Sequence, residues 1–177
     1  EGPFYPVGDI ARDADLVSLE PGGAEADGQI IRILGRVQDE RCRPIARAHV
    51  EIWQACVSGK YDRPDDTSTN PLDPAFQYWG RAISDVDGQY AFRTIVPGAY
   101  LAAPGRYRPP HVHCKVKARG FRPLTTQLHF DPEGIEDPTL AAMARRWNAA
   151  ERVPDELVVK LVGGVGHFVL TLSRIRR

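Results

Sequence analysis

The sequence predicts an all-β fold, an antiparallel sandwich of two sheets with about eight or nine strands, long loops around the functional site and one short helix. Short segments of alternating polar and apolar residues recur along the chain, and many are bounded by turn residues drawn from 16 glycines and 15 prolines. Only one segment has good helical periodicity. With 177 residues and 42% hydrophobic content, we expect residues 1–177 to form a single domain.

The N-terminal residues 1–28 mix glycine, proline and acidic residues with short apolar pieces, which indicates an irregular arm. Nine strands are expected after it, at residues 30–37, 48–55, 80–84, 89–95, 99–102, 111–117, 124–130, 156–162 and 167–173. The first two are predicted to form a hairpin or an adjacent pair. Residues 58–74 are rich in proline and aspartate, so we expect a long loop there, of the kind that often carries function.

The single helix is expected to start at Pro138. Asp137 is a suitable N-cap and proline is favoured at the first helical position. Apolar side chains then recur at helical spacing from Leu140 to Trp147.

The composition limits the classes of partner. Twenty-three basic residues balance 23 acidic ones, so the net charge gives no reason to expect binding to nucleic acid or to an anionic membrane. No apolar run approaches the roughly 20 residues that span a bilayer, and the first residues lack the pattern of a signal peptide. Cys42, Cys56 and Cys114 show no Cys-x-x-Cys spacing, which favours free thiols and a cytoplasmic location.

A histidine pair is the main candidate for chemistry. His111 and His113 are two positions apart in an expected strand, so their side chains leave the same face and can reach one metal ion. A strand can also carry two such histidines without a metal. Arg108 places a permanent cation beside them, where an anionic substrate can use it, although a surface salt bridge is the alternative role.

Tyrosines are the candidates for further ligands. No carboxylate stands close after His113 at the spacing of a facial triad, whereas a phenolate oxygen can hold ferric iron. Tyr61 and Tyr100 are chosen because both stand beside expected loops, where a side chain can be aimed independently of a sheet pattern. Tyr90 alternates with its strand neighbours, so core packing is predicted for it.

Taken together, these residues resemble the intradiol catechol dioxygenases, and within them the protocatechuate 3,4-dioxygenase type. The resemblance covers most of the chain and rests on a set of motifs in order: Glu1-Gly2-Pro3-Phe4-Tyr5, Ile52-Trp53-Gln54-Ala55, Gly59-Lys60-Tyr61, Leu72-Asp73-Pro74 through Gly80-Arg81, Asp87-Gly88-Gln89-Tyr90, Phe92-Arg93-Thr94-Ile95, Pro97-Gly98-Ala99-Tyr100, Arg108-Pro109-Pro110-His111-Val112-His113 and Thr126-Gln127.

The resemblance implies one non-haem Fe(III) per chain, held by the four residues Tyr61, Tyr100, His111 and His113. It implies that a catechol-type substrate chelates the iron in place of Tyr100, and that O2 cleaves the ring to a cis,cis-muconate-type diacid. Arg108 would stabilise negative charge on the substrate, and Gln127 would help to orient it. Protocatechuate or another substituted catechol is expected, with the ring substituent left open.

The sequence departs from the family pattern around Tyr107. Tyr100 and His111 are only 11 positions apart, so the loop at the pocket mouth is short. Tyr107 stands before Arg108 where a tryptophan is more familiar, which makes it a substrate-binding candidate and a rival phenol to Tyr100 at the iron. The short N-terminus leaves no room for the helical dimerisation region of catechol 1,2-dioxygenases, which favours assembly with like or related chains.

A non-catalytic module is the alternative. Several motifs also resemble transthyretin-like or carboxypeptidase-regulatory sandwich modules, which bind or scaffold without chemistry: Gly35-Arg36-Val37, Pro44-Ile45, Asp87-Gly88-Gln89-Tyr90 and Pro97-Gly98-Ala99-Tyr100. The combination of Tyr61 with the histidine pair and Arg108 distinguishes a dioxygenase from a scaffold module, because a scaffold has no need of these residues together.

Overall fold

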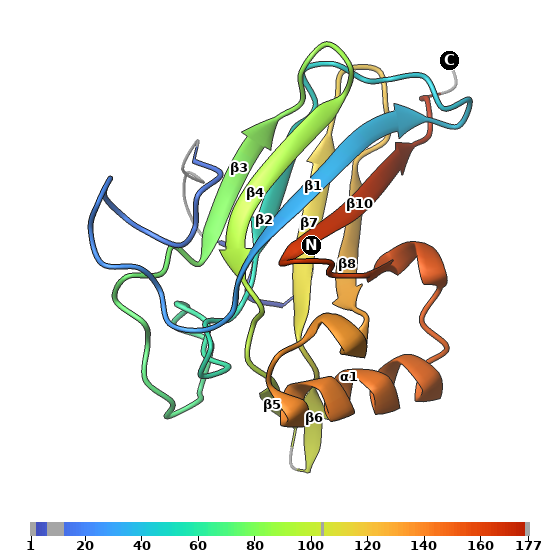
Figure 1. Ribbon diagram of the computed structural model, residues 1–177. Helices are drawn as coiled ribbons and strands as arrows, with labels where there is room; N and C mark the ends of the chain where they lie inside the picture. Colours follow the sequence, from blue (N-terminus) through green and yellow to red (C-terminus); the bar gives the residue numbers. More distant parts are fainter. Residues whose placement is uncertain (1–2, 7–12, 104, 176–177) are drawn as a thin grey trace.

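A computed structural model of the chain describes residues 3–6, 13–103 and 105–175. Two β-sheets lie face to face, with a small hairpin and one helix at one end of the sandwich (Figure 1). The three-stranded sheet has the order β10-β1-β4, with bounds Val165–Leu172, Ile30–Asp39 and Gln89–Ile95. The five-stranded sheet has the order β3-β2-β7-β8-β9, with bounds Trp79–Ile83, His49–Trp53, His111–Lys117, Leu124–Phe130 and Val158–Val159. The hairpin pairs β5 (Tyr100–Ala103) with β6 (Arg106–Arg108).

The predicted all-β sandwich is confirmed, and its sheets are mixed rather than wholly antiparallel. β10 runs parallel to β1, and β9 runs parallel to β8. All other pairings between the described strands are antiparallel. β9 can run parallel to β8 because the chain between them passes through the helix α1 (Pro138–Ala150) before it returns to the same sheet.

Two expectations about individual strands were wrong. β1 and β2 do not pair: β1 lies between β10 and β4, whereas β2 lies between β3 and β7 in the other sheet. The connection between them crosses from one layer to the other, so that both strands pack on one core from opposite sides. The strand expected at 156–162 is reduced to β9, because the 3-10 helix η2 (Asp155–Leu157) takes up its start.

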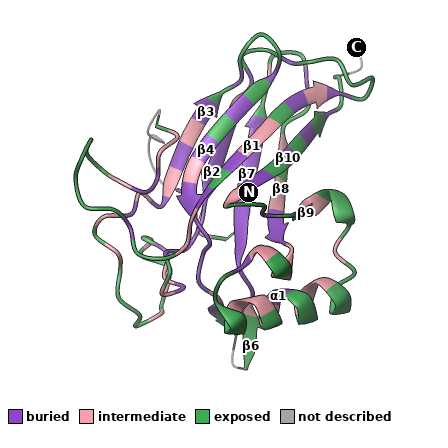
Figure 2. Cartoon of the chain, in the orientation of Figure 1, coloured by how far each residue is buried: buried purple, intermediate pink, exposed green. Residues whose placement is uncertain are grey.

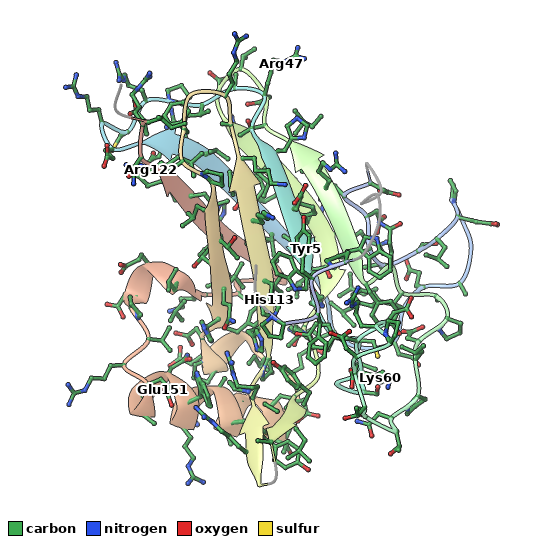
Figure 3. The ribbon with its side chains drawn as sticks, turned by 180° about the vertical axis from the view of Figure 1, so that it is seen from behind. Tyr5, Arg47, Lys60, His113, Arg122 and Glu151 are labelled. Carbon is green, nitrogen blue, oxygen red and sulfur yellow. The ribbon has the colours of Figure 1, made fainter. Side chains whose placement is uncertain are left out.

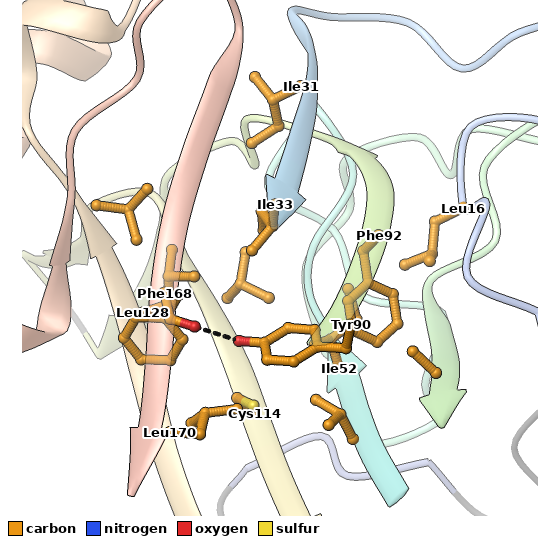
Figure 4. Close-up of a cluster of buried hydrophobic side chains, with 14 of the residues drawn as sticks. Leu16, Ile31, Ile33, Ile52, Tyr90, Phe92, Cys114, Leu128, Phe168 and Leu170 are labelled. Carbon is orange, nitrogen blue, oxygen red and sulfur yellow. Dashed lines mark hydrogen bonds between the residues drawn. The ribbon is translucent and has the colours of Figure 1, made fainter. Parts of the chain in front are cut away.

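Alternate side chains of the two sheets fill the space between the layers (Figure 4). Ile31, Ile33 and Phe92 come from the three-stranded sheet, and Ile52 and Leu128 face them from the five-stranded one. Each is at most 3% exposed, which removes large apolar areas from water and provides the main stabilisation of the sandwich.

Tyr90 has the core role expected of it. Its ring is buried, and its hydroxyl donates a 2.7 Å hydrogen bond to the carbonyl oxygen of Phe168 across the sheet (Figure 4). Gly35 makes room for that ring, because a Cβ at this position would lie 2.3 Å from the ring carbon Cζ of Tyr90. A buried phenol is thereby satisfied without a water molecule.

The helix α1 spans Pro138–Ala150, so its predicted start is confirmed. The carboxylate of Asp137 accepts hydrogen bonds from the backbone N–H groups of Thr139 and Leu140, as an N-cap should. α1 lies across the end of the sandwich that carries the β5–β6 hairpin (Figure 1). None of the helices in the described part of the chain has the length and apolar character needed to cross a membrane.

The strand β7 is buried along nearly all of its length, unlike a strand with one solvated face (Figure 2). Val112 and Cys114 point into the core between the sheets, so His111 and His113 must point to the outer face. Both histidines are nevertheless buried, at 2% and 1% exposure. Other parts of the chain therefore cover this end of the outer face.

Candidate metal centre

The register of the five-stranded sheet places polar and aromatic groups in rows across three strands. His113 pairs with Trp53 on β2 and with Gln127 on β8, and His111 pairs with His129. The indole of Trp53 stacks on the His113 ring with 4.8 Å between centroids and 6° between planes. Figure 3 shows His113 on this outer face, with Tyr5 nearby on the N-terminal arm. The strand register therefore fixes the position of His113, and the stacked indole of Trp53 fixes the tilt of its ring.

Two loops bring the tyrosines to the same place. The loop after β2 carries Tyr61, and the loop after β4 ends at Tyr100, the first residue of β5. Gly59 and Gly98 let the two backbones touch, because a Cβ on either residue would lie 2.2 Å from a carbonyl oxygen of the other loop. The N–H groups of both glycines donate 3.0 Å hydrogen bonds to the carbonyl of Cys56. Close approach of this kind requires glycine.

Side chains hold the first half of the loop that carries Tyr61. At its start, the buried amide of Gln54 donates to the carbonyl of Ile95 at 3.0 Å and accepts from the Thr94 hydroxyl at 2.8 Å. Further along the loop, the Asp66 carboxylate accepts a hydrogen bond from the backbone N–H of Tyr61 at 2.7 Å. Lys60 lies 3.8 Å from the same carboxylate group. The bonds of Gln54 to β4 and the bond of Asp66 to the Tyr61 backbone thus position the phenol of Tyr61.

The four residues expected to bind metal converge. Ring centroids are 5.4 Å apart for Tyr61 and Tyr100, 5.6 Å for Tyr100 and His111, and 4.9 Å for His111 and His113. Tyr61 and His113 close the group at 6.2 Å. Within the described ranges, no set of three or more histidine, cysteine or carboxylate side chains is grouped so that it could hold a metal. The donors gathered here are two imidazoles and two phenols.

Three polar atoms in this group are buried with no hydrogen-bond partner among the described residues: Oη of Tyr61, Nε2 of His111 and Nε2 of His113. Buried polar atoms are almost always satisfied, so an orphaned set at one place needs an explanation. His111 Nδ1 is 2.8 Å from the Pro109 carbonyl and donates to it, which leaves Nε2 with a free lone pair. The donor set fits a metal ion that prefers imidazole nitrogen and phenolate oxygen.

Burial sets the protonation of these groups. It lowers the pKa of His111 well below its ordinary value, an effect that the neighbouring His113 strengthens. Burial lowers the pKa of His113 to about 3, and the charge of Arg108 acts in the same direction. Both imidazoles are therefore neutral and able to coordinate at pH 7. Burial raises the pKa of Tyr61 well above its ordinary value, and Tyr100 raises it further, so this phenol keeps its proton without a metal.

Arg108 and Gln127 lie together beside the four rings. Nη2 of Arg108 donates a 2.7 Å hydrogen bond to Oε1 of Gln127. Burial raises the pKa of Tyr100, and the positive charge of Arg108 opposes that rise, so the guanidinium acts electrostatically on the phenol. Tyr107 is separate from this cluster. Its side chain is 56% exposed on the β5–β6 hairpin, whereas Tyr100 is 8% exposed, so the geometry favours Tyr100 over its rival.

Several neighbours of the site were not identified from the sequence. Phe4 on the N-terminal arm stacks on Tyr61 with 4.4 Å between centroids and meets Tyr100 edge-on at 5.9 Å. His129 on β8 is buried, its ring lies 6.0 Å from that of His111, and its Nδ1 has no hydrogen-bond partner among the described residues. The spacing of Gln127 and His129, two positions apart like the histidine pair, was the available signal.

Comparisons with known proteins agree with this geometry. A sequence model for the family described as "Dioxygenase" matches residues 1–162. The protocatechuate 3,4-dioxygenase beta chain of Burkholderia cepacia is 38% identical over 142 residues, a match that covers 77% of this chain and 60% of that protein. Catechol 1,2-dioxygenase 2 of Acinetobacter lwoffii is 36% identical over 144 residues, covering 74% and 50%. The matched part thus spans about half to three fifths of these relatives.

A solved structure matches over nearly its whole length. The dioxygenase domain of a dioxygenase carbohydrate-binding protein fusion from Streptomyces sp. SirexAA-E superposes with a TM-score of 0.66 and 29% identity, covering 99% of this chain and 96% of that one. The fold and the buried donors define a β-sandwich protein with a candidate metal centre. The chain belongs to the intradiol ring-cleavage dioxygenase family.

Proposed function

We propose that this protein is a non-haem Fe(III) intradiol dioxygenase that cleaves a catechol-type diol with O2 to a cis,cis-muconate-type diacid. The observation that carries the proposal is the convergence of two phenols and two imidazoles, three of which have a buried donor atom with no partner. The names of the similar proteins support protocatechuate or another substituted catechol as the substrate. A scaffold module gains nothing from burying such atoms, which counts against the non-catalytic alternative.

The ligands in this proposal are the four residues predicted from the sequence, Tyr61, Tyr100, His111 and His113, with one iron per chain. When bound there, Fe(III) supplies Lewis-acid activation of the chelated catecholate toward O2. The burial of the four rings excludes water from the ligand set, which strengthens every electrostatic interaction within it. Trp53 and the Pro109 carbonyl hold the two imidazoles in their coordinating orientation.

The other residues bind and orient the substrate. Arg108 stabilises negative charge on the catecholate, and Gln127 fixes the guanidinium through the 2.7 Å bond from Nη2. Tyr100 is more exposed than Tyr61, at 8% against 2%, so its Oη would be the phenol oxygen better placed to take up one of the two protons of an incoming catechol. Tyr107, on the exposed side of the hairpin, contributes at most to the rim of the substrate site.

Compartment and assembly form part of the same proposal. Three free thiols, at Cys42, Cys56 and Cys114, support a cytoplasmic location. The name of one relative describes it as a beta chain, which supports assembly with like or related chains.

The test is a visible absorption spectrum of the iron-loaded protein, before and after anaerobic addition of a panel of catechols. We expect a broad band from phenolate-to-iron charge transfer that shifts when a catechol chelates. In Tyr61→Phe that band should weaken and move, because one phenolate is lost. A colourless protein that retains iron, with a spectrum that no catechol changes, would refute phenolate ligation.

Iron uptake should release protons, because a phenol must become a phenolate to coordinate. The raised pKa values of Tyr61 and Tyr100 keep both protonated in the metal-free protein at neutral pH. Acid therefore competes with the metal, and iron affinity should fall as the pH is lowered. A titration in weak buffer should detect at least about two protons per iron, reduced by about one in Tyr61→Phe. Equal release from both proteins would exclude Tyr61 as a ligand.

A further inference from the structure

The helix α1 reaches the proposed site through one side chain. Trp147 lies near its C-terminal end, and its indole ring lies against the guanidinium of Arg108, with 4.8 Å between Cζ and the ring centroid. Arg106 lies at 6.0 Å from the same ring. The two arginines are two positions apart on β6, so one face of the hairpin meets the helix (Figure 1). A cation over an indole is attracted to the negative ring face.

Few contacts orient the guanidinium. Its Nη2 donates to Gln127, whereas its Nε is buried and has no hydrogen-bond partner among the described residues. A single hydrogen bond leaves a long side chain free to rotate about the axis of that bond. The flat indole restricts this rotation, because the guanidinium carbon Cζ lies over the ring face, 4.8 Å from its centroid.

The helical turn that carries Trp147 is held against the sheet. Asn148, next to Trp147, donates a 3.0 Å hydrogen bond from Nδ2 to the carbonyl of Phe130 at the end of β8. Ala144, one turn earlier, is 1% exposed and packs into the core. β8 also carries Gln127. Arg108 therefore contacts Gln127, which lies on β8, and Trp147, whose helix is hydrogen-bonded to β8 through Asn148.

We propose that Trp147 is a positioning residue that holds the guanidinium of Arg108 in the orientation that receives an anionic catecholate. This inference rests on the proposed function for the role of Arg108, while the contact itself can be tested without any catalysis. It makes α1 part of the substrate site, although no residue of the helix belongs to the four-ring cluster. Arg108 keeps its charge in all Trp147 variants. We therefore expect these variants to bind the catecholate more weakly because the guanidinium loses its fixed orientation.

The first experiment observes the Nε–H signal of Arg108 by NMR in the metal-free protein, with Arg108→Lys used to assign it. A proton near an aromatic face is displaced by the ring current, and a buried Nε–H exchanges slowly enough to be seen. We expect a displaced signal in the unmodified protein that returns to the ordinary arginine range in Trp147→Ala and stays displaced in Trp147→Phe. Arg106→Ala is the matched control, since it removes the outer cation from the same ring, and it should leave the signal in place.

The second experiment measures binding of a chromophoric catechol, 4-nitrocatechol, to the iron-loaded variants under anaerobic conditions. Trp147→Ala should weaken binding about three- to ten-fold and Trp147→Phe less, while Arg106→Ala should match the unmodified protein. An unmoved Nε–H signal in Trp147→Ala would overturn the positioning role, whatever the activity. A moved signal in a protein that binds no catechol would instead contradict the proposed function, so the two failures are distinguishable. A moved signal with unchanged catechol affinity would also overturn the role of Trp147 in substrate binding.

Discussion

His113→Ala is expected to leave the protein almost free of iron, with an affinity lower by at least about 100-fold, because loss of even an outer hydrogen-bond partner of a ligand costs 10- to 100-fold. His113 is buried, and its ring is fixed by the stacked indole of Trp53. Its neighbour His111 already occupies the adjacent corner of the cluster, with 4.9 Å between the two ring centroids. Metal analysis and the visible band should therefore be lost together.

The matched control for this substitution is His167→Ala. His167 is an exposed histidine on β10, in the opposite sheet, so its loss should change neither the iron content nor the spectrum. Unfolding of the metal-free His113→Ala protein should be measured as well. Removing the ring leaves a cavity, but it also removes a buried Nε2 that has no partner, and these two effects on stability oppose each other. A fully iron-loaded His113→Ala protein would show that the metal site lies elsewhere.

The parts of this site that could be predicted from the sequence are those fixed by local geometry. The two-residue period of a strand placed His111 and His113 on one face, and the N-cap Asp137 with Pro138 located the helix. The Pro97-Gly98 turn marked the place where Tyr100 enters, because a glycine there permits the close approach to the loop of Tyr61. These signals lie within a few residues of the groups that they position.

The parts that could not be predicted depend on contacts between distant segments. β1 and β2 are neighbours in the sequence but lie in different sheets. This arrangement depends on both strands packing onto one core from opposite sides. Phe4 meets Tyr61 only because the arm crosses the end of the five-stranded sheet. Trp147 was recognised as part of an amphipathic helix, but its periodicity carries no information about the arginine that its ring contacts. In each case the tertiary fold supplies the partner.

Arg108→Ala is expected to lower kcat/KM by about 10²- to 10³-fold, the usual cost of removing one donor that stabilises developing negative charge. Iron content should stay near that of the unmodified protein, because Arg108 contributes no atom to the proposed ligand set. Arg108→Lys should recover part of the loss. It retains a charge but cannot form the planar contact with Trp147 while bonding to Gln127.

The same substitution separates two roles that Arg108 can play. The guanidinium opposes the burial that raises the pKa of Tyr100, so its loss should make this phenol harder to ionise. If that effect dominates, the visible band of the substrate-free protein changes in Arg108→Ala and iron binding becomes more sensitive to acid. If charge stabilisation on the substrate dominates, the resting spectrum is unchanged and only catechol binding and turnover fall.

We expect the second result, because Arg108 is bonded to Gln127 and lies over the ring of Trp147 rather than being paired with the phenol. A normal rate in Arg108→Ala would exclude both roles, and Arg106→Ala controls for loss of positive charge on the hairpin.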